Sequence, residues 1–127
     1  MWVQLACRAK TAPVIGMVDS GAHGTLLPKS EAGALGLDAA TDLIETPEGS
    51  GGAGGTTFAT WTTIHAISGQ ILAMLPDGPQ LWGPVIQFKP VFAEGAHALL
   101  GRQDFFKYFS ITFVNDPTHG AVFHLDY

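Results

Sequence analysis

Basic residues, cysteine and long apolar runs are all scarce in this chain. Six Lys and Arg stand against eleven Asp and Glu, for a net charge of −5, and the cations form no run, so the sequence lacks a nucleic-acid footprint. The single cysteine, Cys7, excludes a disulfide within the chain. No apolar run approaches the roughly 18 residues that cross a bilayer, and a signal-peptide pattern is missing at the N-terminus. We therefore expect a cytoplasmic protein, or a soluble domain of a longer one, with neither nucleic acid nor membrane as a partner.

Glycine and proline are plentiful, and they predict many turns and few helices. The 127 residues include 16 Gly and 8 Pro, and their 46% apolar content argues against disorder. This length fits one domain, residues 1–127. Short helices are expected at 31–35, between Ser30 and Gly36, and at 103–108. We expect about eight strands, at 2–9, 14–18, 43–46, 56–67, 71–75, 85–92, 110–114 and 121–125, and a short extended piece at 26–28. The predicted fold class is all-β, a small closed β-barrel.

Three motifs stand out against this background. An apolar run ends in Val18-Asp19-Ser20-Gly21-Ala22 and continues into Thr25-Leu26-Leu27-Pro28. Alone, an aspartate after a strand indicates an Asx turn, although a carboxylate beside a buried strand is costly unless it is hydrogen-bonded. A glycine-rich stretch, residues 51–55, lies between two predicted strands and is either a hairpin tip or a plain loop. Leu99-Leu100-Gly101-Arg102 then precedes the second predicted helix.

In this order and spacing, the motifs resemble those of the retroviral-type aspartic proteases, the retropepsins, and their bacterial relatives. The resemblance implies a barrel of the acid-protease type with one short C-terminal helix and a glycine-rich flap hairpin. Asp19 would be the catalytic acid or base, with Ser20 and Gly21 completing the catalytic motif. Substrate would be bound by Gly21, Ala22, Gly52, Ala53, Gly54 and Gly55. Leu99, Leu100, Gly101 and Arg102 would support the site from beneath. The substrate would be an extended peptide or protein segment with apolar side chains near the scissile bond.

The chemistry of this family needs two carboxylates that share one proton, and the chain holds one Asp-Ser/Thr-Gly motif. Asp77 and Asp116 lie in predicted turns, and Asp104 lies on a predicted helix. The second carboxylate must therefore come from another copy of the chain in a C2 homodimer. The resemblance thus implies an aspartic-type endopeptidase, a peptide hydrolase without cofactor or metal. The alternative is a catalytically silent retropepsin-like domain for dimerisation or peptide binding.

Some positions depart from the retroviral pattern. An acid often follows the catalytic Asp by four residues and pairs with the Arg of the Gly-Arg motif, but here that position is His23, so the partner of Arg102 stays open. The acid of the helix, Asp104, comes one place later than in the common Gly-Arg-Asp. The chain is also longer between the motifs, and we expect the extra length in a hairpin within residues 71–94. The five histidines, which show no metal-ligand spacing, are His23, His65, His97, His119 and His124.

Overall fold

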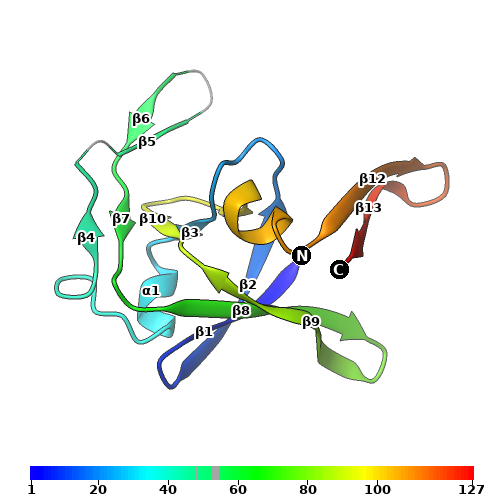
Figure 1. Ribbon diagram of the computed structural model, residues 1–127, viewed down its shortest axis with the longest axis horizontal. Helices are drawn as coiled ribbons and strands as arrows, with labels where there is room; N and C mark the ends of the chain where they lie inside the picture. Colours follow the sequence, from blue (N-terminus) through cyan, green and yellow to red (C-terminus); the bar gives the residue numbers. More distant parts are fainter. Residues whose placement is uncertain (48, 53–54) are drawn as a thin grey trace.

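The computed structural model describes residues 1–47, 49–52 and 55–127, and it is built mostly of β-strands (Figure 1). The first strands are β1 (Trp2–Cys7), β2 (Lys10–Val18), β3 (Leu26–Pro28), β4 (Ile44–Glu45), β5 (Ser50–Gly51), β6 (Thr57–Phe58) and β7 (Trp61–Thr62). The later strands are β8 (Ile67–Leu75), β9 (Gly78–Phe88), β10 (Val91–Ala93), β11 (Ala98–Leu100), β12 (Ser110–Asp116) and β13 (Gly120–Asp126). The two helical segments are short: α1 (Glu31–Ala34) and a π-type turn, η1 (Arg102–Phe106). The predicted β-rich class is confirmed.

Nine strands form one mixed sheet in the order β4-β7-β10-β3-β11-β2-β1-β8-β9. Most neighbours are antiparallel, but β10 runs parallel to β3, and β11 runs parallel to β2. Strand β11 therefore lies between β2 and β3, although it comes about 70 residues after β3 in the chain. We expected a closed barrel, but within the described residues the end strands β4 and β9 pair with no further strand, so closure is not found.

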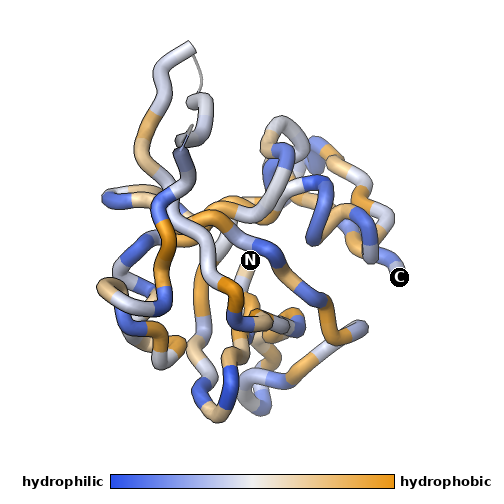
Figure 2. Tube along the Cα trace, turned by 60° about the vertical axis from the view of Figure 1, so that its left-hand side comes forward, coloured by the Kyte–Doolittle hydropathy of each residue, from blue (hydrophilic) through white to orange (hydrophobic). Residues whose placement is uncertain are grey.

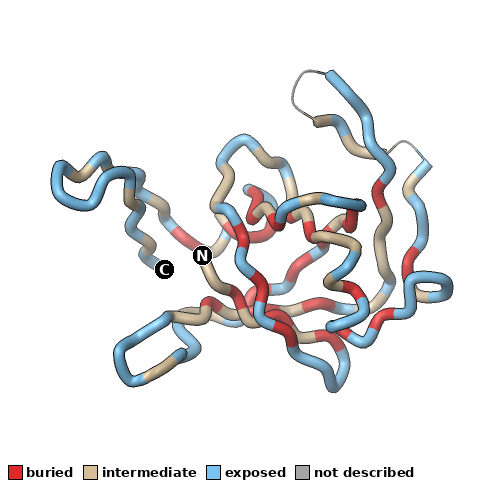
Figure 3. The backbone as a smooth tube through the Cα atoms, turned by 180° about the vertical axis from the view of Figure 1, so that it is seen from behind, coloured by how far each residue is buried: buried red, intermediate tan, exposed pale blue. Residues whose placement is uncertain are grey.

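The core lies on one face of the long strands. Side chains alternate across a strand, so Val3, Leu5 and Cys7 of β1 are buried together with Ala12 and Val14 of β2. Burial of each large apolar side chain contributes about 1.5–3 kcal/mol. Figure 2 shows apolar residues along the strands of the body, and Figure 3 shows the buried positions gathered there while the hairpin ends are exposed. The other large, fully buried apolar side chains are Leu27, Leu35, Ile67, Ile86, Phe92, Leu100 and Phe105.

Several predicted elements have different bounds in the structure. The strand expected at 56–67 is broken into β6 and β7, and residues 63–66 belong to no strand. The strand expected at 85–92 divides into β9 and β10 at Lys89 and Pro90, because proline has no N–H for the ladder. Helix α1 ends before Gly36, which has φ +73°, but the Ser30 side chain makes no capping bond. The hairpin expected within residues 71–94 is present as the β8–β9 hairpin, which spans residues 67–88.

Two further hairpins project from the body at opposite sides of the view (Figure 1). Strands β5 and β6 form one, and β12 and β13 form the other, each as a separate two-stranded sheet.

Neither helical segment in the described part of the chain has the length and apolarity needed to cross a membrane.

Candidate functional site

The Asp19 turn follows directly on β2. The N–H of Asp19 donates to the carbonyl of Leu100 at 3.1 Å, so the turn begins as a continuation of the parallel ladder between β2 and β11. The N–H of Gly21 donates to Oδ1 of Asp19 at 2.8 Å, and the N–H of Ala22 donates to its carbonyl at 3.2 Å. A Cβ at Gly21 would lie 3.2 Å from Oδ1 of Asp19, which is a tight contact. The turn has the hydrogen bond of an Asx turn, and it fixes one carboxylate oxygen of the half-buried Asp19.

The Leu-Leu-Gly-Arg motif lies against this turn, as the resemblance implies. In the register of β11 and β2, Leu99 lies beside Met17, and Leu100 lies beside Val18. Leu100 is fully buried, and a Cβ at Gly16 would come within 2.7 Å of its Cγ. Glycine at position 16 therefore makes the room that Leu100 fills beneath the strand carrying Asp19.

Gly101 brings the two motifs into main-chain contact. A Cβ at Gly101 would lie 2.2 Å from the carbonyl oxygen of Gly24, so the close approach requires glycine. The next two N–H groups, those of Arg102 and Gln103, donate to the carbonyls of Ala22 at 3.0 Å and His23 at 2.9 Å. Main-chain atoms of β11 and η1 thus hold residues 19–24 from one side.

Asp104 is a site residue whose role the sequence did not reveal. Its carboxylate is buried, and it accepts hydrogen bonds from the N–H of Thr25 at 3.2 Å and from the N–H of Lys89 at 3.4 Å. These bonds join η1 to the end of the Asp19 loop and to the chain after β9. The sequence singled out Asp104 as the acid that comes one place later than in the common Gly-Arg-Asp. Its hydrogen-bond partners could not be predicted, because they lie 79 and 15 residues away in the sequence. Asp104 therefore braces the loop through backbone groups.

Arg102 and Ser20 face outward. Both residues are exposed, and the Arg102 guanidinium has no ion pair within residues 1–47, 49–52 and 55–127. His23 contributes its carbonyl to η1, which leaves the partner of the guanidinium open. The roles of Ser20 and Arg102 in a dimer stay predictions.

The described residues of the glycine-rich stretch, 51–52 and 55, belong to or adjoin a hairpin. Strand β5 pairs with β6 in antiparallel register, with Gly51 beside Thr57, and the N–H of Gly52 donates to the carbonyl of Thr56 at 2.6 Å. The backbone of Gly55 has φ +80°, which favours glycine. Ala53 and Gly54, also expected at the flap tip, lie outside the described residues. The β5–β6 hairpin projects from the body, as a flap would (Figure 1), and its contact with a substrate stays a prediction.

An apolar hollow of about 450 Å³ lies between the base of this hairpin and the strands that support Asp19. Leu26 and Leu99, which face each other across β3 and β11, form one wall, and Phe58 and Trp61 contribute another. Lys29 lies 3.7 Å from the centroid of the Trp61 ring. The remaining lining residues are Ala59, Ala93, Glu94, Gly95, Ala96 and His97. We name this cavity the apolar hollow.

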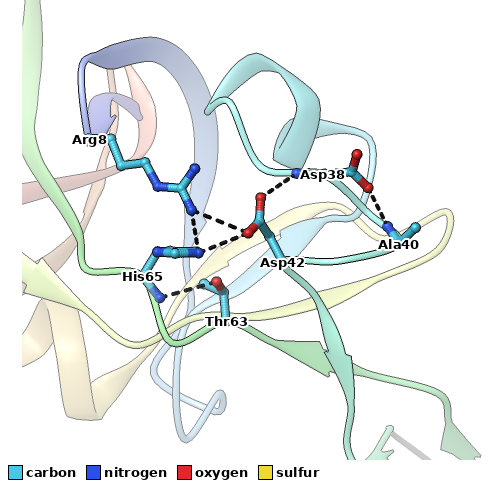
Figure 4. Close-up of polar contacts among 6 residues, drawn as sticks. All are labelled: Arg8, Asp38, Ala40, Asp42, Thr63 and His65. Carbon is cyan, nitrogen blue, oxygen red and sulfur yellow. Dashed lines mark hydrogen bonds and ion pairs between the residues drawn. The ribbon is translucent and has the colours of Figure 1, made fainter.

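The side chains of Arg8, Asp42 and His65 lie together in a polar cluster (Figure 4). Oδ1 of Asp42 lies 3.2 Å from a guanidinium nitrogen of Arg8 and 2.9 Å from Nε2 of His65, and the same nitrogen of Arg8 also contacts Nε2. The N–H of Asp38, foremost, and the His65 ring hold the pKa of Asp42 below its ordinary 3.8. A guanidinium only donates, so Nε2 accepts when it bonds to Arg8 and donates when it bonds to Asp42. We call these three residues the Asp42 cluster.

Within the described part of the chain, no three His, Cys, Asp or Glu side chains gather as they would around a metal ion. A scan against protein-family models finds no match to the chain, and a search of curated proteins finds none either.

Proposed function

We propose that the chain is an aspartic endopeptidase of the retropepsin type, active as a C2 homodimer, with an open form of the acid-protease sheet. One observation carries the proposal. The two motifs that resemble this family meet at one point, where the Asp19 N–H donates to Leu100 and the N–H groups after Gly101 donate to the Asp19 loop. Separation of these motifs in space would have removed the basis of the resemblance.

The chemistry follows from one carboxylate in each subunit. Asp104, the acid bonded to the same loop, is buried and accepts from two backbone N–H groups, so it is a poor second acid. Asp19 of a second copy would supply the partner. Two carboxylates at close range hold one proton between them. The ionised one takes a proton from water as general base, while the protonated one donates to the scissile carbonyl.

Other features support a peptide substrate and a second copy. The apolar hollow borders the strand that supports Asp19, which suits an apolar substrate side chain near the scissile bond. The projecting β5–β6 hairpin provides backbone groups for an extended peptide. On the C-terminal hairpin, Phe113 and Phe123 pair with ring centroids 6.3 Å apart and remain 56% and 37% exposed. An exposed aromatic pair of this kind suits a contact between two copies.

The test is cleavage of a mixed peptide library at about pH 5, where a dyad sharing one proton works, read by mass spectrometry. Three forms are compared: the native chain, Asp19→Asn, and the matched control Asp77→Asn. Asn keeps the oxygen that bonds the Gly21 N–H, so the Asp19 turn is retained, and Asp77 is exposed in the β8–β9 turn. We expect cuts from the native chain and from Asp77→Asn, and none from Asp19→Asn.

Cuts that persist in Asp19→Asn would refute the proposal. A native chain that sediments as a dimer yet cuts nothing would also refute it, and would favour the catalytically silent dimerisation or peptide-binding domain. A native chain that sediments as a monomer at every concentration would also refute the proposal, because the mechanism needs the Asp19 carboxylate of a second copy.

A further inference from the structure

Half of the chain's few cations gather around one hollow. Lys89 follows β9, Arg102 begins η1, and Lys107 follows η1, and all three line a cavity of about 590 Å³. The chain holds six Lys and Arg in all, so three of six lie together in a protein of net charge −5. The other lining residues are Gln87, Gln103, Asp104 and Tyr108. We name this cavity the basic hollow; no residue that lines it lines the apolar hollow.

The positive charge of the basic hollow is not compensated by the chain itself. Elsewhere, Arg8 pairs with Asp42, and Lys29 pairs with Glu94 at 3.2 Å. No such pair involves Lys89, Arg102 or Lys107 in the part of the chain that the structure describes. Asp104 is the one acid in the lining, and its carboxylate is directed to backbone N–H groups. Three cations against one acid leave a net positive surface.

The available donors indicate what kind of anion fits. Sites for phosphate commonly present a cradle of free backbone N–H groups. Here the N–H of Lys89 donates to Asp104, and those of Arg102 and Gln103 donate to the Asp19 loop. The remaining donors in the lining are long, exposed side chains spread over three points of an open cavity. Such donors suit several carboxylates on a flexible ligand better than one compact anion.

We propose that the basic hollow binds an acidic peptide segment, whose Asp or Glu side chains contact Lys89, Arg102 and Lys107. The amides of Gln87 and Gln103 and the hydroxyl of Tyr108 offer neutral hydrogen bonds to the same segment. Complementary charge in an otherwise acidic protein gives this face selectivity for such a partner. Arg102 and Asp104 also contact the Asp19 loop, but the side chains of Lys89 and Lys107 do not line the apolar hollow, so their variants test this proposal separately from the Asp19 chemistry.

The test measures binding of a fluorescein-labelled hexaglutamate peptide by fluorescence anisotropy at low ionic strength. We expect saturable binding by the native chain that weakens as salt is added. Lys89→Gln and Lys107→Gln should each weaken binding by about two- to fivefold, as expected for one exposed ion pair, and the double variant by about the product. Lys10→Gln is the matched control, because Lys10 is an exposed cation that does not line this hollow. Thermal unfolding of each variant verifies that it is folded.

Three outcomes would overturn the proposal. The first is a native chain that does not bind the peptide. The second is an equal loss of affinity in Lys10→Gln and Lys107→Gln, which would show attraction without a site. The third is displacement of the labelled peptide by inorganic pyrophosphate but not by unlabelled hexaglutamate, which would assign the hollow to a small anion.

Discussion

Replacing Gly101 by alanine tests how closely β11 approaches the Asp19 turn. A methyl group at position 101 would lie 2.2, 2.5 and 2.9 Å from the carbonyl oxygen, carbonyl carbon and Cα of Gly24. All three are main-chain atoms, which cannot rotate away as a side chain can. Real Cβ contacts below 3.0 Å essentially never occur, so the turn must retreat by at least 0.8 Å, the difference between 3.0 and 2.2 Å.

This retreat strains the two hydrogen bonds that hold the loop. The bond from Arg102 to Ala22 is 3.0 Å long, and the bond from Gln103 to His23 is 2.9 Å long. Each contributes about 0.5–1.5 kcal/mol, and overpacking of this kind costs about 1–3 kcal/mol. The two costs overlap, because the lost bonds are how the strain is relieved, so we expect a loss of about 2–3 kcal/mol. For a domain of this size, the melting temperature falls by about 10 °C.

Urea unfolding and thermal scans at one fixed protein concentration measure the effect. Gly33→Ala is the matched control, because Gly33 lies in α1 and a Cβ there has no neighbour within 4 Å. Alanine favours helix over glycine, so this variant should unfold at or slightly above the native temperature. A Gly101→Ala chain within about 0.5 kcal/mol of the native one, the range of neutral surface changes, would refute the close approach of β11.

Two further predictions concern ionisable groups. Because the folded-state pKa of Asp42 is lowered, its stabilising effect is complete above the pKa of the unfolded chain and is lost as the pH falls through the folded value. Asp42→Asn should therefore be less stable than the native chain at about pH 6. The difference between their urea midpoints should become smaller by about pH 3. A difference that stays constant or grows at the lower pH would contradict the contacts of Asp42 with Asp38 and His65. Burial raises the pKa of the Cys7 thiol, so a disulfide reagent at neutral pH should modify the folded chain at least about tenfold more slowly than the urea-unfolded chain. Equal rates in the two states would show that Cys7 is accessible.

The sequence was most informative where a local motif determines a local structure. Asp19-Ser20-Gly21 forms a turn at the end of a strand because the bonds within it span two or three residues. For the glycine-rich stretch the sequence left a hairpin tip and a plain loop open, and the pairing of β5 with β6 on either side of it favours the hairpin. The strand expected at 56–67 was wrong as one element, since β6 and β7 pair with different strands. Strand propensity there is uniform, and tertiary partners decide where pairing stops.

Residue spacing alone did not reveal contacts between distant segments; the contact of Leu99–Arg102 with the Asp19 loop was expected only from the resemblance. Nothing in the spacing of residues reveals that β11 lies between β2 and β3, or that Asp104 accepts from Thr25 and Lys89. The basic hollow was missed for the same reason, because Lys89, Arg102 and Lys107 are scattered in the sequence and form no run. Charge patterns along a chain detect a shared surface only when its members are neighbours in sequence.

The position of β11 also determines when the Asp19 loop can become ordered during synthesis. Its main-chain supports, the carbonyl of Leu100 and the N–H groups of Arg102 and Gln103, lie about 80 residues after Asp19. Contacts at such separation form late, because the intervening chain loses entropy before they contribute. A nascent chain that has emerged only as far as β10 therefore holds Asp19 in an unsupported turn. The strand of the nine-stranded sheet that comes last in the chain thus supplies the supports of the Asp19 loop.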